Sequence, residues 1–250
     1  MIKRLVQGAM HSVGYEVVPY PTPDWVRYRN VVLDLFGMLC INCVVDVGAN
    51  VGQYAAGLRA LGYRGWIISF EPVSRNLEQL RTASANDPKW RVFPWALGRE
   101  NSTAEINVME CSVFDSFLQP DPISAQRFDS DNQVVATELV EVRRLDHVLS
   151  ECVKGIESPR IYLKLDTQGF DLQVVEGAEA ILPDILALQT EVAFHKIYLG
   201  MPGFLQSLQE LLLKGFEVVD FIPVTRENDH LRVIEMDCIM LRSASAIVQI

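Results

Sequence analysis

The feature that most constrains the fold is a glycine-containing stretch, VVDVGANVGQYAAGLRAL, which runs from Val44 to Leu61. An apolar, β-branched run comes first, small residues follow it, and a helical pattern of apolar residues ends it. A strand that leads into glycines and then into a helix leaves backbone N–H groups free at the carboxyl edge of a sheet. Ligands of open α/β sheets bind at that edge, so the stretch predicts a nucleotide-type site.

The rest of the chain repeats this alternation of short apolar runs and amphipathic segments, which is typical of a parallel sheet flanked by helices. Apolar residues recur at i, i+4 and i+7, as in Tyr54, Leu58 and Leu61, and so define buried helix faces. We therefore predict an α/β fold with a doubly wound sheet of seven strands. The expected strands are 43–47, 66–70, 91–94, 161–165, 186–192, 217–221 and 238–241.

Two regions stand outside this alternation. Residues 1–40 have a largely helical pattern with a rigid break at PYPTPDW, so we expect a helical cap or extension beside a main domain at 41–245. Within the main domain, residues 109–140 form a long polar insertion that contains prolines, and Phe114, Phe117 and Phe128 are its apolar anchors. Segments of this kind are usually functional lids or disordered, and we expect an ordered lid over a ligand.

Composition and charge argue against several classes of protein. No apolar run approaches the roughly 18 residues that a membrane span needs, and the start of the chain lacks a secretory signal, so a cytoplasmic location is expected. The net charge of −10 argues against nucleic acid as a partner, because such binding relies on clustered Lys and Arg. The five scattered cysteines favour reduced thiols. The amphipathic start, with Lys3 and Arg4, could contact a membrane surface, although a cap or homodimer helix is the commoner role.

Three cofactor classes use a glycine turn of this kind, and the neighbouring residues distinguish them. A P-loop needs Lys and then Ser or Thr after its second glycine, whereas Gln53 and Tyr54 follow Gly52. The dinucleotide fingerprint needs glycine or alanine where Asn50 and Gln53 stand. The run DVGANVG, which begins at Asp46, suits S-adenosylmethionine better. Its acid can accept a hydrogen bond from an ammonium group, and its small residues let an uncharged nucleoside lie on the backbone.

A second acid follows the second predicted strand. Glu71 lies in the run SFEP, 19 positions after Gly52, where a carboxylate can accept hydrogen bonds from both ribose hydroxyls. NAD sites carry such an acid as well, so Glu71 alone does not separate the two cofactors. The alternative is that Asp46 is a solvated strand end and that Glu71 is an acid favoured by a helix dipole.

Several motifs together resemble the FkbM-type class I methyltransferases. They are VVDVGANVGQYA, SFEPVSRNLEQL, WALG, RRLDHVL, LKLDTQGFDLQVVEGAEAIL, LQTEV and KGFEVVDF, and they cover most of residues 43–241. The run KLDTQGFDLQVVEGA is the most distinctive of them. The resemblance implies a Rossmann-like sheet with a reversed last strand and S-adenosylmethionine as the methyl donor. It also implies transfer to oxygen, often a hydroxyl of a sugar, glycolipid, polysaccharide or secondary metabolite.

The resemblance further implies which residues hold the cofactor, all of them in or after a predicted strand. They are Asp46, Gly48, Asn50 and Gly52 for the methionine part, Glu71 for the ribose, and Ala96 and Leu97 for the adenine. The segment CSVFDS matches the serine-containing stretch of the family only loosely, so Ser112 and Ser116 are expected as lid contacts. A small-molecule or glycan acceptor is expected, chosen by the first 40 residues and the insertion.

Methyl transfer from a sulfonium to a hydroxyl is an in-line displacement, so the protein mainly aligns the acceptor and receives its proton. Asp166 ends the fourth core strand with Lys164 on the same strand face, and it is the first candidate for this role, or else a partner of nearby backbone N–H groups. Glu191 and His195 reach the same edge and are the other candidates for general base. Asp166 and Glu191 could also bind a magnesium ion shared with vicinal hydroxyls.

Two other functions stay open at this point. An NAD-dependent oxidoreductase or epimerase would use a similar sheet, although Asn50 and Gln53 in place of glycines and the lack of a Tyr-x-x-x-Lys pair weigh against it. A binding or scaffold domain could keep the cofactor fold without turnover. Intact acids at Asp46, Glu71 and Asp166 argue against such decay.

Overall fold

The main sheet of the protein has seven strands in the order β3-β2-β1-β7-β8-β10-β9. The computed structural model describes residues 23–125, 128, 131–227 and 231–243. The strands are β1 (Cys43–Val47), β2 (Trp66–Phe70), β3 (Trp90–Phe93), β7 (Ile161–Leu165), β8 (Ile185–Ala193), β9 (Phe216–Arg226) and β10 (Val233–Arg242). β10 is antiparallel to both of its neighbours, whereas β1 is parallel to β2 and β7. The predicted seven-stranded sheet with a reversed last strand is therefore confirmed.

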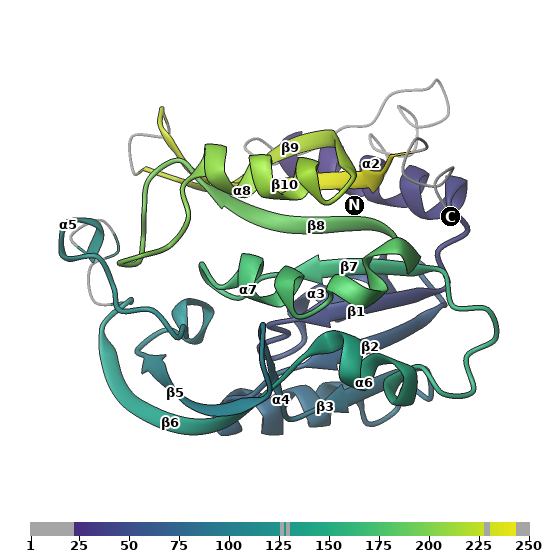
Figure 1. Ribbon diagram of the computed structural model, residues 1–250, viewed down its shortest axis with the longest axis horizontal. Helices are drawn as coiled ribbons and strands as arrows, with labels where there is room; N and C mark the ends of the chain where they lie inside the picture. Colours follow the sequence, from purple (N-terminus) through teal and green to yellow (C-terminus); the bar gives the residue numbers. More distant parts are fainter. Residues whose placement is uncertain (1–22, 126–127, 129–130, 228–230, 244–250) are drawn as a thin grey trace, which may run out of the picture.

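Helices cover both faces of this sheet, which makes the fold doubly wound (Figure 1). The helices on one face are α2 (Pro23–Met38), α3 (Gln53–Ala60) and α4 (Ser74–Ser84), and those on the other are α6 (Leu145–Cys152), α7 (Asp171–Glu176) and α8 (Phe204–Leu213). Two separate clusters of buried apolar side chains hold the layers together, with Leu58 in one and Leu211 in the other. Strands buried on both faces favour apolar residues at nearly every position, and β1 and β7 are apolar apart from one buried charged residue each, Asp46 and Lys164.

A second, three-stranded sheet was not among the predicted elements. Its strands are β4 (Ala96–Leu97), β5 (Ser102–Met109) and β6 (Val134–Arg143), in the order β4-β6-β5. β5 and β6 form a long antiparallel pair that curves away from the main sheet (Figure 1). β5 is buried only over Ile106–Met109 and β6 only at Val140 and Val142, so the rest of both strands is exposed or half-buried and carries no strong strand pattern.

The insertion expected at 109–140 therefore includes the first part of β6. Between β5 and β6 lie a short 3-10 helix, η1 (Ser112–Phe114), and one helical turn, α5 (Pro122–Ala125). The ring of Phe114 packs on that of Phe128 at 5.0 Å, and the ring of Phe117 packs on that of Phe170 at 4.9 Å. The first contact lies within the insertion, and the second holds the insertion against the turn before α7.

The N-terminal region is described from residue 23 onward. Its helix α2 contributes Val32, Leu35 and Phe36 to the core cluster on its face of the sheet. Lys3 and Arg4, the residues expected at a membrane surface, lie outside the described residues. Among the helices in the described part of the chain, none is both long and apolar enough to cross a membrane.

Candidate functional site

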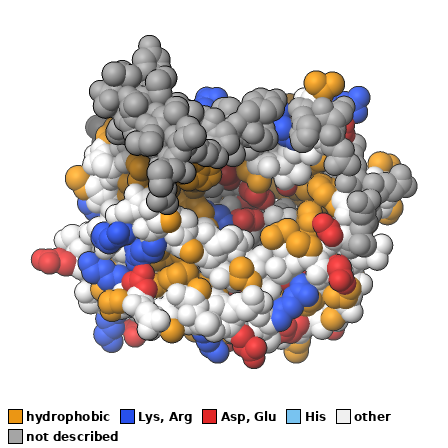
Figure 2. Space-filling model, turned by 180° about the vertical axis from the view of Figure 1, so that it is seen from behind, with side chains coloured by type: hydrophobic (Ala, Val, Ile, Leu, Met, Phe, Trp, Pro, Cys, Tyr) orange, Lys and Arg blue, Asp and Glu red, His pale blue; other side chains and the backbone are white. Residues whose placement is uncertain are grey.

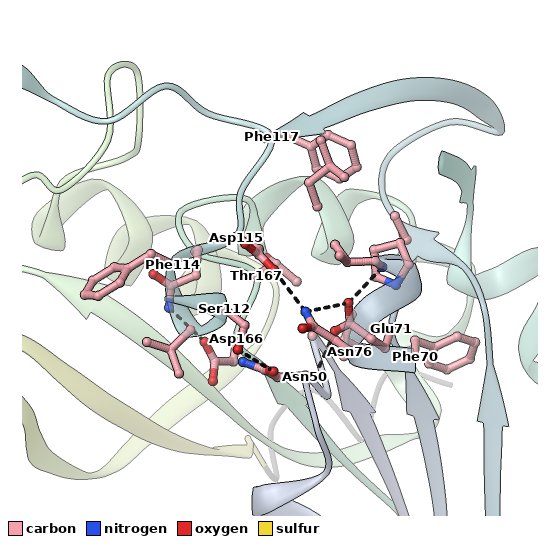
Figure 3. Close-up of a pocket in the computed structure, with 18 of the residues that line it drawn as sticks. Asn50, Phe70, Glu71, Asn76, Ser112, Phe114, Asp115, Phe117, Asp166 and Thr167 are labelled. Atoms are coloured by element: carbon pink, nitrogen blue, oxygen red, sulfur yellow. Dashed lines mark hydrogen bonds between the residues drawn. The ribbon is translucent and has the colours of Figure 1, made fainter. Parts of the chain in front are cut away.

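A cavity of about 330 Å³ lies at the carboxyl end of the parallel strands. Its wall comes from the turns after β1, β2 and β7, from β4 and η1, and from residues of β8, β9 and β10. The size is that of a pocket for a small molecule or cofactor. Figure 2 shows a hollow in which acidic side chains gather, bordered by hydrophobic side chains. Figure 3 shows polar side chains from several elements converging on the cavity.

Two glycines shape the turn after β1, each for a different steric reason. Gly48 has φ of +78°, and a Cβ there would lie 1.9 Å from the carbonyl oxygen of Asp166. Only glycine allows so close an approach of this turn to the end of β7. Gly52 has φ of +90°, and its missing side chain makes room for Leu80 and Trp90 at 2.9 Å. Gly48 lines the cavity, whereas Gly52 serves the packing of α3 and is not part of the wall.

Glu71 joins the turns that follow β1 and β2. Its Oε2 accepts a hydrogen bond from the backbone N–H of Asn50 at 2.8 Å, and its Oε1 accepts one from the backbone N–H of Val73 at 2.9 Å. The side chain is 4% exposed, and this burial raises the pKa of Glu71 to about 7, although the hydrogen bonds lower it. A carboxylate has about four acceptor sites. Glu71, which lines the cavity beside Asn50, therefore keeps capacity to accept from a ligand hydroxyl.

Asp46 lies below the cavity wall, which differs from the expected contact with the methionine part. It is directly opposite Ser69 and Lys164 in the β1 pairings, and its side chain is 0% exposed. Its Oδ2 accepts from the Ser69 hydroxyl at 3.3 Å, and its Oδ1 lies 3.7 Å from Nζ of Lys164. The reason is strand alternation, because Asp46 shares a face with Val44, which packs toward α2 and α3. Asp46 thus interacts with Lys164 without reaching the cavity.

Apolar residues form the part of the cavity beside β4. Ala96 and Leu97, expected at the adenine, are buried and line the wall with Ile106 and Phe117. In Figure 3, Phe117 lies at the rim of the cavity, above Glu71. A flat aromatic group fits between such surfaces.

The segment after β5 is fastened over the turn that follows β2. Asp115 accepts hydrogen bonds from Nη2 of Arg75 and Nδ2 of Asn76, both at 2.9 Å, and from the backbone N–H of Met109 at 2.7 Å. Asn76 also donates to Glu71 at 3.4 Å. Sequence patterns did not single out Asp115, although it lies within CSVFDS. We call this set of bonds the Asp115 clasp.

The two serines of the same segment make different contacts. The hydroxyl of Ser112 donates to Oδ1 of Asn50 at 3.0 Å, and Ser112 lines the cavity. The hydroxyl of Ser116 donates to the carbonyl oxygen of Gln168 at 2.8 Å and is buried away from the cavity wall. One serine therefore reaches the cavity and the other holds the segment onto the turn after β7.

Asp166 and Glu191 come together at the ends of β7 and β8. Oδ2 of Asp166 lies 2.8 Å from Nζ of Lys164. The amide nitrogen of Gln168 donates to Asp166 at 3.0 Å and to Glu191 at 3.1 Å, so it bridges the two carboxylates. The hydroxyl of Tyr198 lies 2.8 Å from the amide oxygen of Gln168, which fixes the orientation of this amide. The sequence analysis did not identify Gln168 or Tyr198 as site residues. The only signals were the position of Gln168 in the DTQG turn and that of Tyr198 shortly after β8.

A third carboxylate, Glu235 of β10, also lines this end of the cavity. Its side chain is 5% exposed. Burial raises the pKa of Glu235 to about 8, and Asp166 adds to the rise. Burial and then Asp166 also raise the pKa of Glu191 well above its usual range. Lys164, in contrast, has a raised pKa because Asp166 and Asp46 outweigh the effect of its burial, so it stays charged.

His195 and the magnesium ligands do not take the expected places. His195 is half-buried, donates its backbone N–H to the carbonyl of Ile234 at 3.3 Å, and is not part of the cavity wall. In the described part of the chain, no group of three or more His, Cys, Asp or Glu residues has the geometry of a metal site. The amide of Gln168 lies between Asp166 and Glu191, where a shared cation would need to be. The structure therefore does not support the magnesium prediction.

The sheet order, the reversed β10, and the glycine turn and acid at the ends of β1 and β2 are those of a class I S-adenosylmethionine-dependent methyltransferase. Residues 46–218 match the family model described as the methyltransferase FkbM domain. The chain belongs to this family, which confirms the resemblance in the sequence motifs.

Solved structures of other methyltransferases are similar to this chain at low sequence identity. A putative S-adenosylmethionine-dependent methyltransferase from Listeria monocytogenes has 9% identity and a TM-score of 0.47, over 88% of this chain and 96% of that one. A putative methyltransferase from Thermobifida fusca has 13% identity and a TM-score of 0.47, over 87% and 80%. Magnesium protoporphyrin IX methyltransferase from Synechocystis PCC 6803, with bound S-adenosylmethionine, has 11% identity and a TM-score of 0.44, over 96% and 97%. No curated protein matches the sequence significantly.

Proposed function

We propose that the protein is an O-methyltransferase that moves the methyl group of S-adenosylmethionine to a hydroxyl of a sugar, glycolipid, polysaccharide or secondary metabolite. The observation that carries this proposal is the bridged carboxylate pair, Asp166 and Glu191, in the wall of the cavity at the ends of β7 and β8. A hydroxyl must lose its proton when it becomes an ether, and a carboxylate at the reacting oxygen can receive that proton.

The residues around the cavity fit the cofactor of the family. Glu71 has acceptor capacity for the ribose hydroxyls, and Gly48 leaves the turn after β1 flat against the end of β7. Asn50 lines the cavity between them, and Ala96 and Leu97 offer an apolar surface for the adenine. We place the methionine part beside β1 and the transferable methyl group toward β7 and β8, which follow β1 in the strand order. Asp46 acts indirectly, through Lys164.

When bound, the cofactor supplies an electrophilic methyl carbon on a positively charged sulfur. Glu191 receives the acceptor's proton as the acceptor oxygen bonds to that carbon and the carbon–sulfur bond breaks, so the products are a methyl ether and S-adenosylhomocysteine. Asp166 is less suited as the base because Lys164 holds its Oδ2 at 2.8 Å. Asp166 instead orients the acceptor, and Gln168 keeps the two carboxylates at a fixed separation.

The proposal is tested by the fate of a labelled methyl group. The protein is incubated with S-adenosylmethionine labelled with ¹³C in the methyl group and with a library of mono- and oligosaccharides and glycolipids, and the products are analysed by mass spectrometry and NMR. A transferred methyl with the carbon shift of an ether, which survives mild alkali, supports O-methylation of a hydroxyl. A methyl ester that alkali removes, or an N-methyl product, would contradict it.

Two variants assign the base. Glu191→Gln should lower kcat by about 10²–10⁴-fold, the usual contribution of a general base, while affinity for S-adenosylhomocysteine stays within twofold. Because burial raises the pKa of Glu191, wild-type activity should rise with pH above the ordinary carboxylate range, and this rise should be absent in Glu191→Gln. The exposed Glu100→Gln is the matched control. A normal pH profile in Glu191→Gln would show that the base is another group.

A further inference from the structure

Three carboxylates occupy the end of the cavity that is remote from Glu71. Asp166 follows β7, Glu191 lies on β8 and Glu235 lies on β10, and these three strands are consecutive neighbours in the sheet. Glu71 follows β2, which is separated from β7 by β1. If the ribose lies on Glu71, as proposed above, the side of β8 and β10 belongs to the acceptor. The acceptor therefore meets three carboxyl groups.

Glu235 is the member of this group whose carboxylate lacks a partner. Glu191 accepts from Gln168, and Asp166 accepts from both Gln168 and Lys164. For Glu235, the structure shows no side-chain hydrogen bond or ion pair within the described residues, although the side chain is 5% exposed and faces the cavity. A buried carboxylate without a donor is costly, and a ligand group that donates hydrogen bonds or carries a positive charge would stabilise its ionised form.

Among the described residues that line the cavity with Glu235, none is a lysine or an arginine. Lys164, the basic residue at the end of β7, is engaged by Asp166 at 2.8 Å and by Asp46 at 3.7 Å. Val224 and Thr225 of β9 complete the wall beside Glu235, and neither is charged. A positive charge beside the ionised Glu235 would therefore come from the bound molecule.

We propose that Glu235 binds a protonated amine of the acceptor, so that the substrate class is an amino alcohol such as an amino sugar. This proposal rests on the proposed function and names the acceptor of the same site. The amine pairs with Glu235, which places the neighbouring hydroxyl toward Asp166 and Glu191 for methylation. Acceptors that carry phosphate or carboxylate at this position are repelled by the same three acids.

The test compares three sugars, titrated by calorimetry into the protein saturated with S-adenosylhomocysteine: two hexosamines that differ only at the C2 nitrogen, and one sugar with a hydroxyl at C2 and a carboxylate at C6. The probes are glucosamine, N-acetylglucosamine and glucuronic acid. Glucosamine should bind at least about tenfold more tightly than N-acetylglucosamine, because one charge-assisted hydrogen bond is worth that factor or more. Glucuronic acid should show no binding. Glu235→Gln should bring the affinity for glucosamine down to that for N-acetylglucosamine.

Control variants separate a direct role from a structural one. Glu235→Asp keeps the charge and should keep the preference for the amine, and Glu210→Gln, which changes an exposed acid on α8, should behave as wild type. Equal affinity for the two hexosamines, no binding of glucosamine, or tighter binding of glucuronic acid would overturn the proposal. A parallel loss of S-adenosylhomocysteine affinity in Glu235→Gln would also overturn it, since the acid would then serve the cofactor. Failure of the wild type to bind S-adenosylhomocysteine would instead refute the proposed function.

Discussion

Replacing Gly48 by alanine tests the steric basis of the site. The new Cβ would lie 1.9 Å from the carbonyl oxygen of Asp166 and 2.8 Å from its carbonyl carbon, so the end of β7 must move by about 1 Å to relieve the overlap. The φ of +78° adds roughly 1–2 kcal/mol of strain for an L-residue. With about 1–3 kcal/mol for the overlap, Gly48→Ala should lower the free energy of unfolding by roughly 3 kcal/mol. Urea denaturation measures this value.

Gly62 offers a matched control for the same substitution. Its φ is +95°, but a Cβ there would meet no atom within 4 Å, so Gly62→Ala should cost only the conformational strain of about 1 kcal/mol. The movement of Asp166 should also weaken binding of S-adenosylhomocysteine in Gly48→Ala by at least about tenfold, whereas Gly62→Ala should bind normally. Equal stabilities for the two variants, or normal cofactor affinity in Gly48→Ala, would refute the steric argument.

Three further predictions follow from the walls of the cavity. Because burial raises the pKa of Glu71 from 4.5 to about 7, the folded state holds this proton more tightly than the unfolded state. The free energy of unfolding should therefore fall by up to about 3 kcal/mol between about pH 4.5 and about pH 7, and denaturation of Glu71→Gln should lack this component. Asp115→Ala removes the acceptor of Arg75 in the Asp115 clasp and should speed dissociation of S-adenosylhomocysteine by about tenfold, measured by stopped flow. An unchanged rate would show that the clasp does not hold the segment after β5 over the bound cofactor. Tyr198→Phe frees the amide of Gln168 and should lower kcat up to about tenfold at constant cofactor affinity, whereas unchanged kcat would show that the amide needs no such support.

Much of the main sheet could be predicted because its strands are buried on both faces. β1, β2 and β7 have the predicted bounds. Every position in them is buried except the first residue of β2, so the mainly apolar runs of the sequence end where the burial ends. β9 extends well beyond the predicted 217–221 because its later part alternates exposed and half-buried residues, and β10 begins before the predicted 238–241 because Glu235 and Asp237 interrupt its apolar run. β5 and β6 were missed for the same reason. Local apolar patterns report burial, and these strands are only partly buried.

The site could be predicted where its residues lie in a continuous motif. Gly48, Asn50, Glu71 and Asp166 follow strands that are themselves visible in the sequence, so their meeting at one edge follows from the parallel sheet. Glu235 could not be found this way. It reaches the cavity through the antiparallel register that pairs it with Ala193, and no local pattern encodes that pairing.

The most direct test of the account is calorimetric titration of the wild-type protein with S-adenosylhomocysteine and, separately, with NAD, repeated on Glu71→Ala. The account predicts one site for S-adenosylhomocysteine, no binding of NAD, and a loss of affinity of at least about tenfold in Glu71→Ala, because its carboxylate accepts from the ribose. Binding of NAD alone, or binding of S-adenosylhomocysteine that Glu71→Ala leaves unchanged, would contradict the placement of the cofactor at the ends of β1 and β2.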